Sequence, residues 1–220
     1  MSEIKIKSLC DKYSIQDYTI NNDYSIDVNG HVRISNTFID KLPINFNIIN
    51  GDFNCYNNEL ETLENSPNYI EGKFNCGRNR IKSLEEGPKS VGSDFICSFN
   101  RLESFKGIQK HIKGGLDCQY NMIKNFRYAP NKIDGRFEFS GNNMKTFEGF
   151  PKNIKKHFIP EHNPINNLWF LFQNKDYIDY FNELDIITND SKDLILDRLN
   201  YFLLDIWISF WILVLFTVML

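Results

Sequence analysis

Four of the five cysteines recur at one fixed interval, which makes them the first candidates for chemistry in this 220-residue chain. Each lies 21 residues after the last, at Cys55, Cys76, Cys97 and Cys118. Regularly spaced thiols could form disulfides, bind zinc, act as nucleophiles or fill space in a core. Each use makes a different geometric demand, so the spacing discriminates among them.

The spacing favours packing over the three chemical uses. Side chains that repeat along parallel strands stack about 4.8 Å apart, which suits neither a disulfide nor a four-ligand zinc site. A catalytic thiol needs exposure and a basic neighbour, whereas this position is expected to point inward. Ile34 and Phe139 occupy the same position in other repeats. We therefore predict a structural cysteine column in the core, with no metal and no cofactor.

Neither the histidines nor any of the usual catalytic motifs indicates a catalytic or metal-binding site. His157 and His162 lie five residues apart, but His31 and His157 fall at an outward position of the repeat, so we interpret them as surface residues. The sequence contains no Gly-rich phosphate loop, nucleophile elbow or metalloprotease helix. We predict that the protein is not an enzyme; a catalyst of an unrecognised type is the less favoured alternative.

The cysteines belong to a longer repeat that must position them. Apolar residues hold the first and eighth positions of seven octets that align without gaps at the same interval: VRISNTFI (32–39), FNCYNNEL (53–60), FNCGRNRI (74–81), FICSFNRL (95–102), LDCQYNMI (116–123), FEFSGNNM (137–144) and FIPEHNPI (158–165). The sixth position is asparagine in six of them: Asn58, Asn79, Asn100, Asn121, Asn142 and Asn163. Self-similarity at this period predicts a stacked-repeat architecture.

Each repeat position can be given a physical role. Apolar residues at the first and third positions alternate with period two, so they share one face of a short strand. The asparagine follows the strand, where its amide can satisfy backbone groups of its own turn and of the next. One repeat cannot bury its apolar side alone, whereas stacked repeats build a continuous core.

This unit resembles the leucine-rich repeat, whose pattern is Leu-x-Leu-x-x-Asn-x-Leu with another leucine beyond. The likeness is closest to the short repeats of about 21 residues in bacterial and bacteriophage proteins. Thr37 in place of the first asparagine and Pro160 in the last strand depart from the pattern. The resemblance implies an α/β fold class: a leucine-rich-repeat solenoid with a parallel β-sheet on its concave side and turn-rich or 3₁₀ return segments.

The sequence pattern divides the chain into four parts. Residues 1–29 are predicted to form an N-terminal cap of a short helix, near residues 8–15, and a β-hairpin. Residues 30–165 hold the leucine-rich repeats, as six full units and a partial seventh. Residues 166–206 show helical periodicity and are predicted to form a helical C-terminal cap. Residues 207–220 are an apolar tail without a charged residue.

The tail leaves three interpretations open. It is shorter than the roughly 20 residues that a membrane-spanning helix needs. It could be a short membrane anchor, an apolar segment buried on the helical cap, or the product of a frame change in the coding sequence.

The composition and the N-terminal sequence limit the classes of binding partner and the cellular location that we expect. A formal charge of −3 gives no broad basic field, so nucleic acid is not an expected partner. Residues 1–16 contain no apolar core of a secretory signal, so we expect a cytoplasmic location or the interior of a host cell. Membrane association through residues 207–220 stays open, and we expect a monomer.

The residues free to meet a partner are those between the core positions of the octets. Aromatic and arginine side chains, which are enriched at protein interfaces, stand at several of them. The predicted partner-binding residues of the concave face are Tyr56, Asn57, Arg78, Ile96, Phe99 and Tyr120.

We therefore predict a non-enzymatic module that binds a protein partner, of unknown identity, through its concave face. The same side chains could instead stiffen the sheet by cross-strand packing, contact a terminal segment of the chain, or bind carbohydrate through their rings. The alternative function is a structural scaffold that the apolar tail tethers to a membrane.

Overall fold

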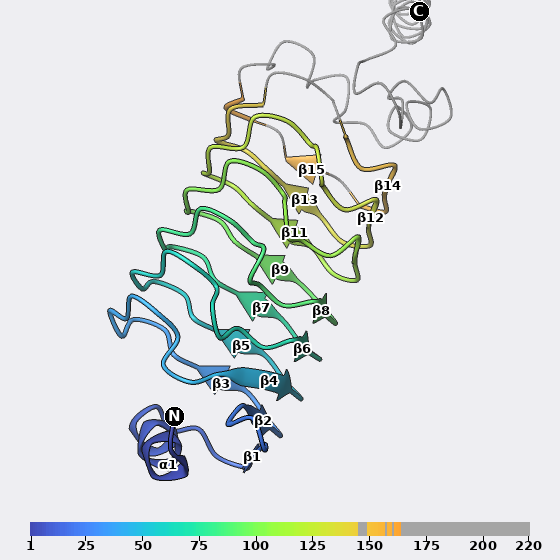
Figure 1. The fold of residues 1–220 in the computed structure, drawn as a ribbon. Helices are drawn as coiled ribbons and strands as arrows, with labels where there is room; N and C mark the ends of the chain where they lie inside the picture. Colours follow the sequence, from blue (N-terminus) through green and yellow to red (C-terminus); the bar gives the residue numbers. More distant parts are fainter. Residues whose placement is uncertain (145–148, 157, 160, 164–220) are drawn as a thin grey trace, which may run out of the picture.

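The computed structural model describes residues 1–144, 149–156, 158–159 and 161–163. Within them the chain winds into a solenoid in which each coil contributes one short strand to each of two stacks (Figure 1). The repeat, the solenoid and the parallel β-sheet predicted from the sequence are confirmed by this arrangement.

The first stack is a seven-stranded parallel sheet in the spatial order β15-β13-β11-β9-β7-β5-β3. Its strands are β3 (Val32–Arg33), β5 (Phe53–Asn54), β7 (Phe74–Asn75), β9 (Phe95–Ile96), β11 (Leu116–Asp117), β13 (Phe137–Glu138) and β15 (Phe158–Ile159). Neighbouring strands pair without offset, so that Phe53 lies opposite Phe74 and Phe74 opposite Phe95. Each strand supplies the first two residues of an octet.

The second stack lies in the return segments, which were expected to be turn-rich or 3₁₀ chain. They contain short strands that pair in parallel, and the described residues hold no 3₁₀ helix. The strands are β4 (Phe46–Ile49), β6 (Tyr69–Ile70), β8 (Ser90–Val91), β10 (His111–Ile112), β12 (Lys132–Ile133) and β14 (Asn153–Ile154). Each two-residue strand buries its β-branched residue and turns the other outward, as strand geometry requires.

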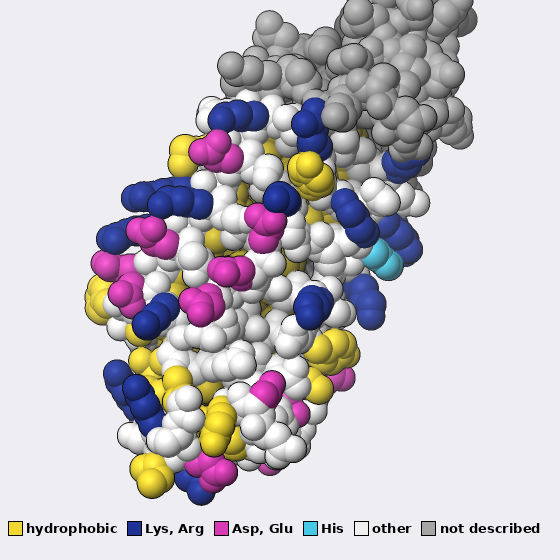
Figure 2. Space-filling view, in the orientation of Figure 1, with side chains coloured by type: hydrophobic (Ala, Val, Ile, Leu, Met, Phe, Trp, Pro, Cys, Tyr) yellow, Lys and Arg dark blue, Asp and Glu magenta, His cyan; other side chains and the backbone are white. Residues whose placement is uncertain are grey.

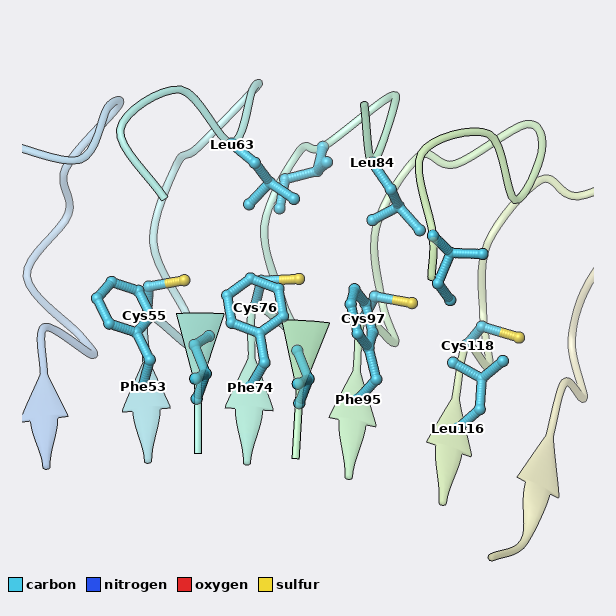
Figure 3. Close-up of a cluster of buried hydrophobic side chains, with 14 of the residues drawn as sticks. Phe53, Cys55, Leu63, Phe74, Cys76, Leu84, Phe95, Cys97, Leu116 and Cys118 are labelled. Atoms are coloured by element: carbon cyan, nitrogen blue, oxygen red, sulfur yellow. The ribbon is translucent and has the colours of Figure 1, made fainter. Parts of the chain in front are cut away.

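The core is built from columns of identical frame positions (Figure 3). Phe53, Phe74 and Phe95 are buried in one column, with ring centroids 6.1 Å and 5.1 Å apart along it. Leu63 and Leu84 complete the same layer from the return segments. Burying each such side chain stabilises the fold by about 1.5–3 kcal/mol. Because no coil has enough apolar surface of its own, this stabilisation exists only in the stack.

The asparagine column satisfies the backbone groups that the stack would otherwise bury without partners. The Asn100 amide nitrogen donates to the carbonyl oxygens of Cys97 (3.1 Å) and of Cys76 in the preceding coil (3.0 Å). The Asn100 carbonyl oxygen accepts from the backbone N–H of Ile81 (3.0 Å), also in the preceding coil. The side chain is only 9% exposed. The amide therefore ties its own turn to the preceding coil, rather than to the next one as expected.

The same hydrogen-bond pattern recurs along the column and is adapted at its start. The asparagines that donate to two such carbonyl oxygens include Asn58, Asn79, Asn121 and Asn142. Thr37, which replaces the first asparagine, places its hydroxyl 3.2 Å from the carbonyl oxygen of Ile34. Its backbone N–H donates to the Asn58 side chain (2.9 Å).

Helix α1 (Glu3–Lys12) and a hairpin precede the first coil. The Ser2 side chain caps the helix by accepting from the Lys5 N–H, and Ile6 and Cys10 are buried. Strands β1 (Tyr18–Ile20) and β2 (Ile26–Val28) pair antiparallel, and β2 then pairs in parallel with β4. The hairpin therefore extends the second stack. The predicted helical C-terminal cap (166–206) and the tail (207–220) lie outside the described residues.

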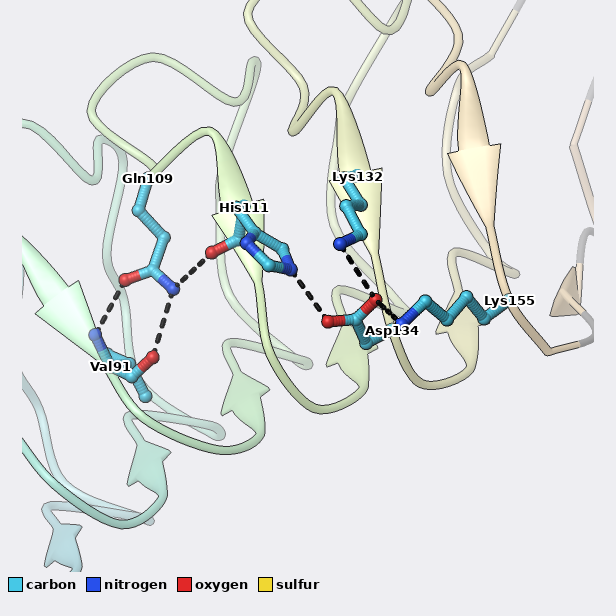
Figure 4. Close-up of polar contacts among 6 residues, drawn as sticks. All are labelled: Val91, Gln109, His111, Lys132, Asp134 and Lys155. Atoms are coloured by element: carbon cyan, nitrogen blue, oxygen red, sulfur yellow. Dashed lines mark hydrogen bonds and ion pairs between the residues drawn. The ribbon is translucent and has the colours of Figure 1, made fainter.

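The second stack is interrupted between β8 and β10, and a side chain bridges the gap (Figure 4). Four other repeats place a proline at the frame position of Gln109: Pro67, Pro88, Pro130 and Pro151. The Gln109 amide accepts from the Val91 N–H (2.6 Å) and donates to the Val91 carbonyl oxygen (3.1 Å). It thus takes the place of a neighbouring strand for Val91.

We predict that Asn100→Ala lowers the free energy of unfolding by about 2–4 kcal/mol, because it leaves the Ile81 N–H buried without a partner and removes one of the two asparagine hydrogen bonds at each of the Cys76 and Cys97 carbonyl oxygens. Urea denaturation followed by circular dichroism measures the difference. The matched control is Asn143→Ala, since Asn143 is exposed and such a surface change costs less than about 0.5 kcal/mol. Equal effects of the two substitutions would contradict the structural role of the column.

Candidate functional site

The cysteine column lies inside the solenoid and is unsuited to chemistry. Cys55, Cys76, Cys97 and Cys118 are each at most 1% exposed and carry free thiols. They stack one above another along the coils and do not converge (Figure 3). Burial raises the pKa of the Cys55 thiol to about 12, so the reactive thiolate is suppressed.

No metal centre emerges from the side chains that the structure describes. Within residues 1–144, 149–156, 158–159 and 161–163, no three His, Cys, Asp or Glu residues are grouped so that they could hold a metal ion. The same residues include no helix that is both long and apolar enough to cross a membrane.

The fifth octet position forms a column of residues in the left-handed backbone conformation. All seven have φ between 50° and 64°: Asn36, Asn57, Arg78, Phe99, Tyr120, Gly141 and His162. Glycine and asparagine adopt this conformation readily, whereas other residues pay about 1–2 kcal/mol. The repeat imposes the conformation, because it occurs in every coil whatever the side chain. Arg78, Phe99 and Tyr120 therefore occupy positions where the backbone favours other residue types.

Three of these side chains and Tyr56 form a continuous ridge of planar groups on the outside of the solenoid, which we call the aromatic ridge. The Phe99 and Tyr120 rings stack with centroids 4.6 Å apart and an interplanar angle of 18°. The Arg78 guanidinium lies 5.2 Å from the Phe99 centroid and 5.9 Å from that of Tyr56. The spacing follows from the strand separation, which is about 4.8 Å.

Glycines lie under two rings of the ridge, and one of these glycines is required. A Cβ atom at Gly141 would lie 2.6 Å from the Tyr120 ring, so any other residue there would displace that ring. A Cβ atom at Gly77 would lie 3.4 Å from the Tyr56 ring, in ordinary van der Waals contact. Both rings therefore lean over the following coil, and Tyr120 can do so only because Gly141 lacks a side chain.

The ridge is exposed even though its rings are apolar. Phe99 is 45% exposed and Tyr120 47% exposed. Stacking on each other and on Arg78 covers only part of each ring, and the remainder faces solvent. Contiguous exposed apolar groups on a soluble protein are typical of interaction sites.

Of the other two predicted binding residues, Asn57 lies beside the ridge and Ile96 lies apart from it. Asn57 is exposed in the same column, and its amide donates to the Asn36 side chain (2.7 Å). Ile96 is half-buried on β9 and lines a separate groove with Asp117 and Glu138. The structure thus brings together Tyr56, Arg78, Phe99 and Tyr120 and places Ile96 apart from them.

Polar residues between the ridge and this groove are occupied with one another. The Ser98 hydroxyl donates to Asp117 (2.8 Å), and Gln119 donates to Glu138 (2.6 Å). The Ser140 hydroxyl donates to Gln119 (2.7 Å). Because their hydrogen-bonding groups are engaged, these residues fix the surface beside the ridge rather than offering a reactive group.

The groove lies between the two stacks, where Gly114, Gly115 and Gly135 leave the corner without side chains. Its volume of about 470 Å³ is within the range of small-molecule sites, but such sites are mostly apolar. Charged side chains of both signs line this one: Asp94, Asp117, Asp134, Glu138, Lys113, Arg136 and Lys156. Asp94 is paired with Lys73 (2.9 Å) and Asp134 with Lys155 (2.7 Å).

Sequence reasoning missed the backbone conformation of the ridge. A signal was present, because asparagine or glycine fills the fifth octet position in three of seven repeats. Arginine, phenylalanine and tyrosine in the central repeats obscured it, since they are not residues that predict a left-handed turn.

We predict that the native protein resists thiol modification. The cysteines of the column should react with a disulfide reagent only as fast as the protein unfolds, whereas Thr62→Cys, at an exposed position, should react at once. Rates measured with and without denaturant test this; rapid native labelling of Cys55 or Cys97 would contradict burial.

A pH dependence follows from the raised thiol pKa values. The unfolded chain releases thiol protons near pH 8.5, whereas burial keeps Cys55 and Cys97 protonated in the folded state. Their contribution to stability is therefore complete below about pH 8.5 and is lost as the pH rises above it. Urea denaturation across this range should show falling stability, and Cys55→Ala combined with Cys97→Ala should flatten the decline. A decline just as steep in this double variant would contradict the assignment.

Comparison with known proteins provides no relative for this chain. No protein-family description, no curated protein and no solved structure matches it.

Proposed function

We propose that this chain is a leucine-rich-repeat solenoid of the α/β class that acts as a non-enzymatic protein-interaction module. Its binding surface is the aromatic ridge, on the side that the resemblance predicts to be concave. The parallel sheet, the asparagine column and the 21-residue register support the assignment to this class.

The functional proposal rests on one observation: bulky rings stand at positions where the backbone conformation disfavours them and where they add little to the core. Phe99 and Tyr120 have positive φ values of 55° and 50°, which the fold accommodates more easily with Asn57 or Gly141. Both rings remain nearly half exposed, so they contribute little to burial. Contact with a partner explains why the protein has residues that raise the conformational energy of the backbone and leave apolar rings exposed to solvent.

The chemistry of the ridge defines the partner. Stacked ring faces accept aromatic or prolyl side chains, and the Arg78 guanidinium at one end can pair with a carboxylate. The planar groups lie in a line across successive coils, which suits an extended segment more than a globular surface. The partner is therefore a protein segment that carries aromatic or prolyl residues and an acidic residue.

The proposal assigns no catalytic role to the surface. The carboxylates near the ridge are engaged, as in the hydrogen bond from Ser98 to Asp117 and the ion pair of Asp94 with Lys73. The buried thiols have raised pKa values, which oppose nucleophilic chemistry.

The second candidate function is a scaffold that the apolar tail tethers to a membrane. It rests on the composition of residues 207–220, which contain no charged side chain. In that case the ridge would only stiffen the coils by stacking, and no partner would depend on it.

We predict that peptides selected from a random linear library on the full chain will carry aromatic or prolyl residues next to an acidic residue. Phe99→Asn combined with Tyr120→Asn should weaken peptide binding on the order of tenfold or more, because it removes the central rings. Asparagine already occupies this column at Asn57, so stability should change by less than about 1 kcal/mol. Fluorescence anisotropy measures the affinities.

Tyr128→Asn is the matched control, because Tyr128 also has positive φ and is 50% exposed but lies outside the ridge. It should leave peptide binding unchanged. Arg78→Gln should weaken only peptides that contain the acidic residue. If the ridge and control variants bind equally well, the proposal fails; selective binding of oligosaccharides instead of peptides would also overturn it.

A further inference from the structure

A second surface of unusual charge lies on the outside of β10, β12 and β14. We call it the basic face; its lysines are Lys110, Lys113, Lys132, Lys152, Lys155 and Lys156. Ile112, Ile133 and Ile154 of the three strands point into the core, so Lys113, Lys132 and Lys155, which alternate with them, face outward. The other three lysines lie beyond the strand ends and are exposed. Dark blue side chains gather along this flank of the molecule (Figure 2).

The repeat does not require lysine at these positions. The frame position of Lys113 and Lys155 is held by Asn50 and Glu71 in earlier coils. Likewise Asn68 stands where Lys110 and Lys152 stand later. Earlier coils form the same strand with neutral or acidic residues at these positions, so folding does not require lysine there. The lysines instead concentrate positive charge on one part of the second stack.

Asp134 is the carboxylate that forms ion pairs with these lysines (Figure 4), and Lys113 and Lys156 also line the groove that contains Asp94, Asp117 and Glu138. Asp134 lies 2.7 Å from Lys155, 3.5 Å from Lys132 and 2.7 Å from the His111 ring. Hydrogen bonds from Lys155 and His111 hold the pKa of Asp134 well below its usual range, so it is ionised at neutral pH. The other four lysines have no ion-pair partner in the described part of the chain.

We propose that the basic face docks on an anionic lipid surface. The three strands span about 10 Å, which is comparable to the Debye length at physiological salt, so the lysines act as one cluster. A cluster of this kind is attracted to phosphatidylserine-rich bilayers, and each lysine near the surface strengthens binding about fivefold.

The composition of the chain favours lipid over nucleic acid as the anion. Among its described residues the face contains lysines and no exposed Phe, Tyr or Trp side chain on which a base could stack, and its one imidazole, of His111, is held by Asp134. The chain also contains the uncharged run 207–220. Stable membrane attachment needs two weak signals, and a basic cluster combined with an apolar segment is one such pair.

This inference does not rest on the aromatic ridge. The ridge lies on the turns after the seven-stranded sheet, whereas the basic face belongs to the second stack. Peptide binding and lipid binding can therefore fail separately, and the result for one says nothing about the other.

Density-gradient flotation of the full chain with vesicles tests the proposal, because aggregated protein sinks while bound protein floats. The chain should float with vesicles of equimolar phosphatidylcholine and phosphatidylserine, more weakly with phosphatidylcholine alone, and less as salt is raised. Lys110→Gln, Lys113→Gln and Lys152→Gln together should weaken binding to the mixed vesicles on the order of a hundredfold.

The matched control removes three exposed lysines elsewhere, as Lys5→Gln, Lys7→Gln and Lys41→Gln, and should leave binding unchanged. Asp134→Asn removes the opposing charge and should strengthen binding about fivefold, a gain that structural damage could not produce.

Three results would overturn the inference. Equal flotation with both vesicle types would assign binding to the apolar tail alone. Equal losses in the face and control variants would make the charge effect unspecific. A double-stranded DNA oligonucleotide that displaces the chain from mixed vesicles, through the same lysines and at lower concentration than phosphatidylserine, would identify nucleic acid as the ligand.

Discussion

The fold depends on a buried amide in each coil after the first, which pairs with the preceding coil. When coils stack in register, the backbone groups at the end of each strand lose contact with water, and each unpaired group would cost about 1–3 kcal/mol. The Asn79 side chain supplies both a donor and an acceptor at this point, reaching Cys55 and Cys76 on one side and Leu60 on the other. An apolar residue could fill the space but not pair the backbone, and a charged one would be buried without compensation. Only an amide meets both requirements.

The tight turn that follows each strand has a second consequence, which concerns the surface. Its fifth octet position is forced into the left-handed conformation in every described coil, and its side chain points away from the core. The core is therefore insensitive to what stands there, as Asn36, Gly141 and His162 illustrate. Selection can place a ring at Phe99 or Tyr120 at a modest backbone cost without disturbing the interior. Because of the turn geometry, the residue type at this surface position can change without affecting the packing of the core.

Periodicity in the sequence was sufficient to predict the strands of the first sheet and the inward direction of Phe53 and Cys55, because apolar residues alternate there. It was insufficient for the second stack, where a strand such as Tyr69–Ile70 is followed by Gly72 and so shows no second apolar residue two positions on. The N-terminal helix begins at Glu3 rather than near residue 8, and the signal that could have placed it was the capping serine, Ser2. Of the predicted binding residues, Ile96 lies in the groove because strand residues and turn residues of one octet face different surfaces. The basic face was missed because a net charge of −3 averages over surfaces of opposite sign.

The two proposed surfaces arise because only some positions of the repeat tolerate a change of residue type. Core and asparagine positions are shared by all coils, so a substitution such as one at Asn100 disturbs two coils at once. Outward positions repeat at a fixed spacing but contact little, so neighbouring coils can present a row of like side chains. Rings at one such position in neighbouring coils produce a ridge, and lysines at several outward positions around β10, β12 and β14 produce a charged face. A row of this kind gains affinity from each member because its members are held in line by the same backbone hydrogen bonds. The repeat therefore brings side chains that are distant in the sequence together on one extended and rigid surface.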